Sequence, residues 1–253
     1  MIQSEKLLGT KTYTLTVTTN PSSATCTLTY DGVSHSTKSA EVKAGTVISY
    51  SIYHSTYGTT SGTITMDSDK TLNCNGTYST SSVDATWSQP TLSSNGTIGS
   101  GTLSVYATSY YMDYQPYKAF DKDASTFYAC KAASVDDRKL NIYTSSAIKI
   151  SSISFQNVNN IHSSSAYTSP WKLAIYAGSS YNTTLVSEYI NTNTTASSWW
   201  TVPVNSSGYY NYHQISFTQY RSSTYKEVEV AEISINAKYK STSYSYYWNK
   251  TIT

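Results

Sequence analysis

Short stretches in which apolar and polar residues alternate recur along the chain, and they constrain the fold more than any other feature. Tyr13, Leu15 and Val17 alternate with threonines, and the spacing returns around Trp200 and Val202. Strict alternation places the apolar side chains on one face of a β-strand. The chain has 26 Tyr against 4 Phe and is dense in Ser, Thr and Asn, which favours strands and turns. We therefore predict an all-β protein.

Breaks in this pattern divide the chain into two β-domains. At 253 residues, the chain is long enough for two modest domains. We predict an N-terminal arm at residues 1–10, a small β-domain at 11–78, a polar linker at 79–82 and a larger β-domain at 83–239. Residues 240–253 are rich in Ser and Tyr, and we expect a C-terminal tail with a frayed end. A docking role for the aromatic residues of this tail is the alternative.

The first domain has the strand and turn order of a known repeat. The matching stretches are residues 15–28, residues 43–47 and the turn Tyr57-Gly58. They resemble PEGA-type Ig-like domains, which are common in bacterial surface proteins and bacteriophage tail proteins. The resemblance implies a small Ig-like β-sandwich that acts as a spacer.

Two distant segments of the second domain offer oxygen ligands for a cation. Asp121, Asp123 and Thr126 supply carboxylate and hydroxyl oxygens within one short loop, and Glu232 follows far along the chain. Oxygens of this kind are the ligands that Ca²⁺ prefers. A cation between them would join the entry loop of the domain to its exit strand. The alternative is that the aspartates form only an Asx-turn while Glu232 pairs with Lys122.

The same segments belong to a wider resemblance. The motif Ala119-Phe-Asp-Lys-Asp-Ala-Ser-Thr126 is followed by matching stretches at residues 140–142, 150–155, 171–179 and 230–237. In this order they resemble the discoidin fold, which coagulation-factor C-type domains share with family 32 carbohydrate-binding modules. The resemblance implies that the second domain is a discoidin-like β-sandwich of the jelly-roll type.

The resemblance also implies a structural calcium ion. In that family the aspartates and threonine of the loop and a late glutamate hold Ca²⁺, with backbone carbonyls completing the site. The ligand set carried over to this chain is Asp121, Asp123, Thr126, Ala231 (through its carbonyl) and Glu232. The chain departs from the family pattern at Lys122, where Gly is usual, and at Tyr128, where Trp is usual.

In the discoidin family, ligands bind to loops at one end of the sandwich, and we expect these loops to lie away from the metal site. Sugar recognition uses a flat aromatic ring together with polar groups that contact hydroxyls. Trp199 is expected to point outward, because its neighbour Trp200 belongs to an apolar face. The predicted ligand-binding residues are Arg138, His162, Tyr167, Trp199, Tyr220 and Arg221. Ordinary packing is the alternative for each aromatic taken singly.

Charge and hydropathy argue against several classes of protein. The net charge of +2 and the 13% of charged residues give no strong field for nucleic acid or for a membrane surface. No apolar run approaches the roughly 20 residues of a membrane-spanning helix. The first residues lack the apolar core of a signal peptide, so we expect no secretion.

Histidine and cysteine spacing indicates no catalytic or metal motif. His35, His54, His162 and His213 stand in no zinc-protease or nucleophile-elbow pattern. We therefore expect no enzymatic activity. Cys26 and Cys74 fall on apolar strand faces and are interpreted as small buried residues, with a disulfide between them as the alternative.

Together these features predict a non-enzymatic bacteriophage virion appendage, such as a tail or head fibre or a decoration protein. We expect a homo-oligomer that is assembled in the bacterial cytoplasm and joined to other virion proteins through residues 1–10. Its partner would be a carbohydrate or protein receptor on the host surface. The alternatives are a purely structural virion protein, and a secreted bacterial adhesin or carbohydrate-binding module.

Overall fold

A computed structural model describes residues 10–96, 101–131, 138–159, 165–181, 183–221 and 227–253. Strands dominate it, and the helices of these residues are the four-residue α1 (Ser165–Thr168) and the 3-10 turn η1 (Pro116–Ala119). The all-β prediction is confirmed. Within the described ranges, no helix has the length and apolar character needed to cross a membrane.

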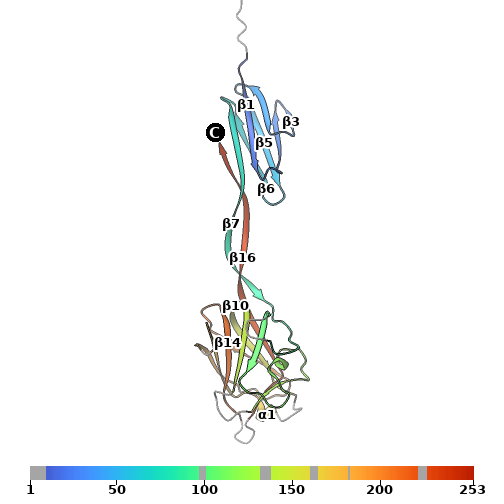
Figure 1. The fold of residues 1–253 in the computed structure, drawn as a ribbon, viewed down its shortest axis with the longest axis vertical. Helices are drawn as coiled ribbons and strands as arrows, with labels where there is room; N and C mark the ends of the chain where they lie inside the picture. Colours follow the sequence, from blue (N-terminus) through green and yellow to red (C-terminus); the bar gives the residue numbers. More distant parts are fainter. Residues whose placement is uncertain (1–9, 97–100, 132–137, 160–164, 182, 222–226) are drawn as a thin grey trace, which may run out of the picture. The chain divides into compact units, whose positions relative to one another are not determined.

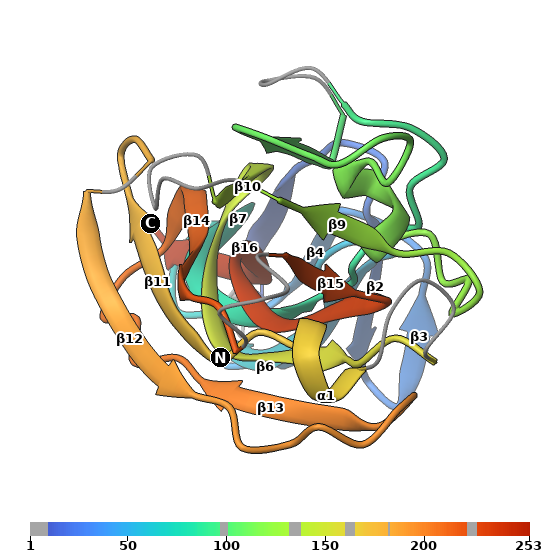
Figure 2. The ribbon, with the colours of Figure 1, turned by 90° about the horizontal axis from the view of Figure 1, so that it is seen from below.

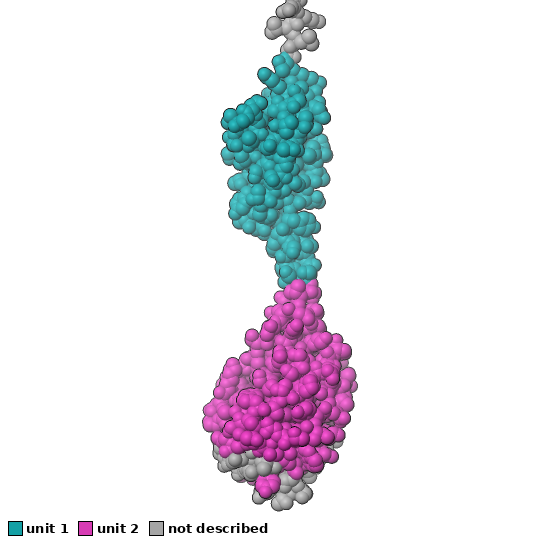
Figure 3. Space-filling model, turned by 180° about the vertical axis from the view of Figure 1, so that it is seen from behind, with its two compact units in different colours: residues 1–81, 242–253 teal, residues 82–241 magenta. Residues whose placement is uncertain are grey.

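The chain forms two compact units, which Figure 3 shows in different colours. Unit 1 contains residues 1–81 and 242–253, and unit 2 contains residues 82–241. The chain passes between the units twice, once within β7 (Lys70–Trp87) and once within β16 (Glu232–Ile252).

The units divide between residues 81 and 82, inside the predicted linker 79–82, but these residues form part of strand β7. Residues 240–252 continue strand β16, where a frayed tail was expected. The last residue, Thr253, exchanges two backbone hydrogen bonds of 3.0 and 2.8 Å with Thr71. Small hydroxyl side chains are typical of loops, but they also fit an exposed strand whose backbone groups bond to a neighbouring strand.

Unit 1 is a β-sandwich. One sheet has the order β3 (Val33–His35), β2 (Thr25–Tyr30), β5 (Val47–His54), β6 (Gly58–Thr65). The facing layer contains β4 (Ser39–Lys43), β1 (Thr12–Asn20) and the first part of β7. Alternating residues of both layers fill one core, for example Leu15, Leu28, Ile52 and Leu72. The Ig-like assignment of this sandwich stays a prediction.

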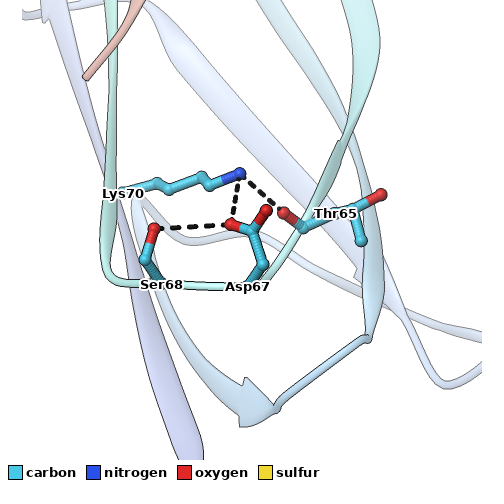
Figure 4. Close-up of polar contacts among 4 residues, drawn as sticks. All are labelled: Thr65, Asp67, Ser68 and Lys70. Atoms are coloured by element: carbon cyan, nitrogen blue, oxygen red, sulfur yellow. Dashed lines mark hydrogen bonds and ion pairs between the residues drawn. The ribbon is translucent and has the colours of Figure 1, made fainter.

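The turn that carries the chain from β6 to β7 is fixed by Lys70 (Figure 4). Its ammonium group donates a hydrogen bond of 2.9 Å to the carbonyl of Thr65 and lies 2.8 Å from Oδ1 of Asp67. The hydrogen bond from Lys70 lowers the pKa of Asp67. Ser68 donates to the same carboxylate at 3.4 Å, so three polar contacts close the connection between the two sheets.

Unit 2 is built around a sheet whose strands are labelled in Figure 2, some of them also in Figure 1. Its order is β12 (Thr184–Ile190), β11 (Lys172–Gly178), β14 (Tyr210–Gln219), β10 (Lys139–Gln156), β16, and both β8 (Leu103–Ala107) and β13 (Trp199–Pro203) also pair with β10. A separate pair joins β9 (Tyr128–Cys130) to β15 (Val228–Val230). The core between these strands includes Phe120, Tyr128, Phe155, Trp200 and Phe217.

The long strand β10 changes partners along its length. Its first part pairs with β8 and β14, and its second part pairs with β13 and β16. The register with β14 shifts between Tyr143 and Ile148, which marks an irregularity where the partners change. The end of β10 therefore places Gln156 between Trp199 on one side and Glu232 on the other.

The three cysteines, Cys26, Cys74 and Cys130, are buried, and none of them is in a disulfide bond. Burial raises the pKa of the thiols of Cys26 and Cys74, which keeps both protonated at neutral pH. The interpretation of these cysteines as small core residues is confirmed.

Candidate functional site

The predicted ligand loop, residues 121–126, folds around its own oxygen atoms. Oδ1 of Asp121 accepts a hydrogen bond from the backbone N–H of Asp123 at 2.9 Å, and Oδ2 accepts from the Thr126 hydroxyl at 2.7 Å. Asp123 accepts from the hydroxyl and backbone N–H of Ser125 at 2.6 and 3.0 Å. The hydrogen bond from the Ser125 hydroxyl lowers the pKa of Asp123. These contacts form the Asx-turn that the sequence suggested.

Lys122 adopts a left-handed backbone conformation with φ of 61°. This is the conformation that favours Gly, the residue that the family resemblance leads one to expect here. The chain thus keeps the turn with a lysine, at a cost of roughly 1–2 kcal/mol in backbone energy.

Glu232 joins the exit strand to this loop. Glu232 is 6% exposed, and Asp121 lies close enough to its carboxyl group to affect its pKa. Among the described residues, no ion pair joins Glu232 to Lys122. Burial first, and Asp121 second, raise the pKa of Glu232 to about 7. Within the described part of the chain, its Oε1 atom is buried without a hydrogen-bond partner.

The oxygen donors of this cluster are of the chemical kind that Ca²⁺ prefers. Burial and the nearby carboxyl groups of Asp121 and Asp123 raise the pKa of Glu232, whereas Asp123 itself is exposed. Carboxylate, hydroxyl and carbonyl oxygens are hard donors suited to Ca²⁺. Asp121 and Asp123 accept hydrogen bonds from their own loop, and the described residues hold no ready-made group of three His, Cys, Asp or Glu side chains around one point. Ala231, the expected carbonyl donor, is buried immediately before β16.

A cavity of about 470 Å³ opens beside this cluster. Because directly paired residues share one face of a sheet, Trp199, Gln156 and Glu232 present their side chains on the same side. Trp199 is 48% exposed and Trp200 only 6%, as the alternation predicted. The walls of the cavity are formed by Gln89, Lys122, Ala124, Gln156, Trp199, Glu232, Ile233, Ser234 and Ile235.

The amide groups in the cavity wall are held in place by the backbone. Gln156 donates a hydrogen bond of 3.1 Å to the carbonyl of Ser197. Gln89 donates to the carbonyl of Ile233 at 2.8 Å and accepts from the N–H of Ile235 at 2.6 Å. A flat indole ring beside fixed amides and a carboxyl group can stack on a sugar ring and contact its hydroxyls.

The polar residues Gln89, Gln156 and Ser234 of this cavity were not predicted from the sequence. Gln156 stands at the end of an alternating stretch, and this position could have indicated a polar side chain at the end of a strand. The expectation that ligand recognition lies away from the metal loop stays a prediction, and the cavity beside Trp199 offers a different location. Lys122 and Glu232 share the cavity with Trp199, because β10 brings β13 and β16 to its two edges.

The other predicted ligand residues lie elsewhere. Arg138 is 5% exposed, and its guanidinium group lies 4.3 Å from the centre of the Tyr220 ring, so it is a packing residue rather than a surface contact. Arg221 donates hydrogen bonds to the backbone carbonyls of three residues, Ser169, Pro170 and Asn191. Tyr167 on α1 is 48% exposed but does not line the cavity. His162 is outside the described residues.

No family model matches the sequence, and no curated protein matches it. Among solved structures, the family 32 carbohydrate-binding module of Clostridium perfringens NanJ in complex with galactose is similar, with 20% identity and a TM-score of 0.41 over 54% of this chain and 93% of that one. Two such domains of C. perfringens ZmpB in complex with GalNAc are also similar, with 14% identity and a TM-score of 0.44. The match covers 54% of this chain and 34% of that one. A family 89 glycoside hydrolase of C. perfringens matches 56% of this chain with 20% identity and a TM-score of 0.42. The match covers only 14% of the length of that hydrolase.

Proposed function

We propose that the chain is a non-enzymatic carbohydrate-binding protein whose ligand lies in the cavity beside Trp199. The observation that carries this proposal is the half-exposed indole ring beside Gln156 and Glu232. The indole face offers an apolar surface to the C–H groups of a sugar, and the amide and carboxyl groups reach its hydroxyls. The cavity volume of about 470 Å³ is within the range of roughly 300–1,000 Å³ for small-ligand sites.

A structural calcium ion is part of the proposal. Its ligands are Asp121, Asp123, Thr126, Glu232 and the carbonyl of Ala231. When bound, the ion supplies positive charge that keeps the carboxyl groups ionised. Lys122 and Glu232 belong both to this cluster and to the cavity wall. An ion that orders the loop would therefore also order the wall of the cavity.

A glycan array with matched tryptophan variants tests the binding site. The wild-type chain should bind at least one glycan class, and Trp199→Ala should weaken that binding by about tenfold or more. Trp171→Ala is the control, because Trp171 is similarly exposed at 42% and does not line the cavity. Silence across the array, or equal affinity for wild type and Trp199→Ala, contradicts the proposal.

The proposed setting is a bacteriophage virion, with a host surface carbohydrate as the ligand. The sequence composition and the resemblance of both β-domains support it. Mass spectrometry of purified particles tests the location, and adsorption of particles that carry Trp199→Ala tests the role. Normal adsorption by such particles favours the rival function, a structural virion protein that uses its β-units for subunit contacts.

A further inference from the structure

A continuous row of aromatic rings lies in unit 1, and none of its residues lines the Trp199 cavity. Neighbouring ring centres are 5.3 Å apart for Trp248 and Tyr57, 5.8 Å for Tyr57 and Tyr246, and 6.0 Å for Tyr246 and Tyr78. Tyr244 continues the row at 5.7 Å from Tyr78. We call these five residues the aromatic row.

The row continues the core face of unit 1 beyond the sandwich. Side chains two positions apart share a strand face, so Leu72 and Cys74 of β7 point into the core and Tyr78 follows on the same side. Between them, Gly76 leaves room for the Tyr57 ring, since a Cβ atom there would lie 2.5 Å from that ring. The second sheet of the sandwich supplies Tyr57 at its turn, and the outer rings lie past this point.

Packing explains the inner rings of the row but not the outer ones. Trp248 packs against the core and donates a hydrogen bond of 3.1 Å to the carbonyl of Gly58. Tyr78, Tyr244 and Tyr246 are 56%, 53% and 45% exposed. Contacts between rings on neighbouring strands stabilise the strands, but they leave the outward half of each ring open to water.

The size and chemistry of the exposed surface indicate what covers it. Three half-exposed tyrosines offer roughly 300 Å² in total, whereas each partner in a stable protein interface contributes about 800 Å². The alternating positions between residues 76 and 80 and between 242 and 248 carry no charged side chain, and Thr80 and Thr242 add hydroxyls. The spacing of the rings is comparable to the length of one pyranose residue.

We propose that the aromatic row binds an extended neutral polysaccharide, with successive sugar residues lying against Tyr246, Tyr78 and Tyr244. The rings supply apolar faces, and the phenol groups supply hydrogen bonds at their outer ends. An open row suits the middle of a long chain, whereas a closed cavity suits a short ligand or a chain end. This site is separate from the Trp199 cavity and does not depend on the function proposed for it.

Affinity gel electrophoresis of the full chain tests the proposal, with laminarin, galactomannan, hydroxyethylcellulose and dextran as probes. All proteins carry Trp199→Ala, so that retardation reports on the row alone. At least one polysaccharide should retard this protein, and adding Tyr78→Ser with Tyr246→Ser should weaken the affinity by about tenfold or more. Tyr247→Ser is the matched control, because Tyr247 is 49% exposed and lies on the opposite strand face.

Thermal unfolding of each variant shows whether it folds. If the double variant does not fold, Tyr244→Ser takes its place, since its ring contacts only Tyr78 and Tyr246 among the described aromatic residues. Absence of retardation by all four polysaccharides overturns the proposal, and so does an equal loss in Tyr247→Ser. Sedimentation velocity adds a further check, because self-association that is lost in Tyr246→Ser would make the row a contact between copies of the chain.

Discussion

The buried carboxyl group of Glu232, at the start of β16, lies close to Asp121 in the loop that precedes β9. Glu232 is buried, which favours its neutral form, and Asp121 accepts two hydrogen bonds from its own loop. Removing the proton of Glu232 places a negative charge in this buried position, close to the carboxyl group of Asp121. The junction therefore responds to pH and to any cation that replaces the proton.

Without calcium, raising the pH from 5 to 8 should lower the free energy of unfolding. The folded-state pKa of Glu232, about 7, exceeds its ordinary value of 4.5, so folding favours the protonated form. The stabilising contribution of this group is complete below pH 4.5 and is lost as the pH rises through 7. The loss amounts to about 3 kcal/mol. Urea unfolding in EDTA at several pH values measures it.

Two variants separate this effect from the titration of other groups. Glu232→Gln carries no titratable group and should lose most of the pH dependence between 5 and 8. Glu188→Gln is the control, because Glu188 is exposed and lies 3.7 Å from Lys172 on another edge of the unit. An unchanged slope in Glu232→Gln would mean that Glu232 is not the titrating group.

Calcium should raise the melting temperature at pH 8. An ion that binds only the folded state stabilises it by about 2.7 kcal/mol at 100 times its Kd, which corresponds to roughly 5–10 °C for a unit of this size. Asp121→Asn should abolish the response, and Asp113→Asn, at an exposed position outside the cluster, should keep it. Differential scanning calorimetry with Ca²⁺ and with EDTA gives the comparison. Equal melting temperatures in both conditions would exclude the ion.

Local alternation and the loop motif were enough to predict parts of this site. They placed Trp199 outward and Trp200 inward, and they brought Asp121 and Glu232 together although the two lie far apart in sequence. Each of these inferences depends on the direction of a side chain within one strand, or on a motif with a known geometry.

The remaining features depend on long-range contacts that local sequence does not encode. Gln89 bonds to the backbone of Ile233 and Ile235, and nothing around Gln89 signals that partner. Ser- and Thr-rich segments become strands in β7 and β16, because β-structure depends on the neighbouring strand more than on composition. Arg138 was expected at the surface, but it is buried, with its guanidinium group over the ring of Tyr220.

Gly76→Ala should destabilise unit 1 because the new methyl group collides with the Tyr57 ring at 2.5 Å. A forced contact of this kind costs roughly 1–3 kcal/mol. In a Tyr57→Ala background the collision is absent, so the same substitution should cost much less. A double-mutant cycle by urea unfolding measures the difference. Equal losses of stability in both backgrounds would show that a collision with the Tyr57 ring is not the cause.

Trp248→Ala should destabilise unit 1 more than any other single aromatic truncation in residues 242–253. Trp248 packs against the core, donates a hydrogen bond to the carbonyl of Gly58 and contacts Tyr57. Truncating a fully buried Trp costs about 3–5 kcal/mol, so this partly exposed one should cost about 2 kcal/mol. Tyr247→Ala is the matched control on the other strand face and should cost well under 1 kcal/mol. Urea unfolding compares the two, and equal small losses would mean that the C-terminal strand does not contribute to the stability of unit 1.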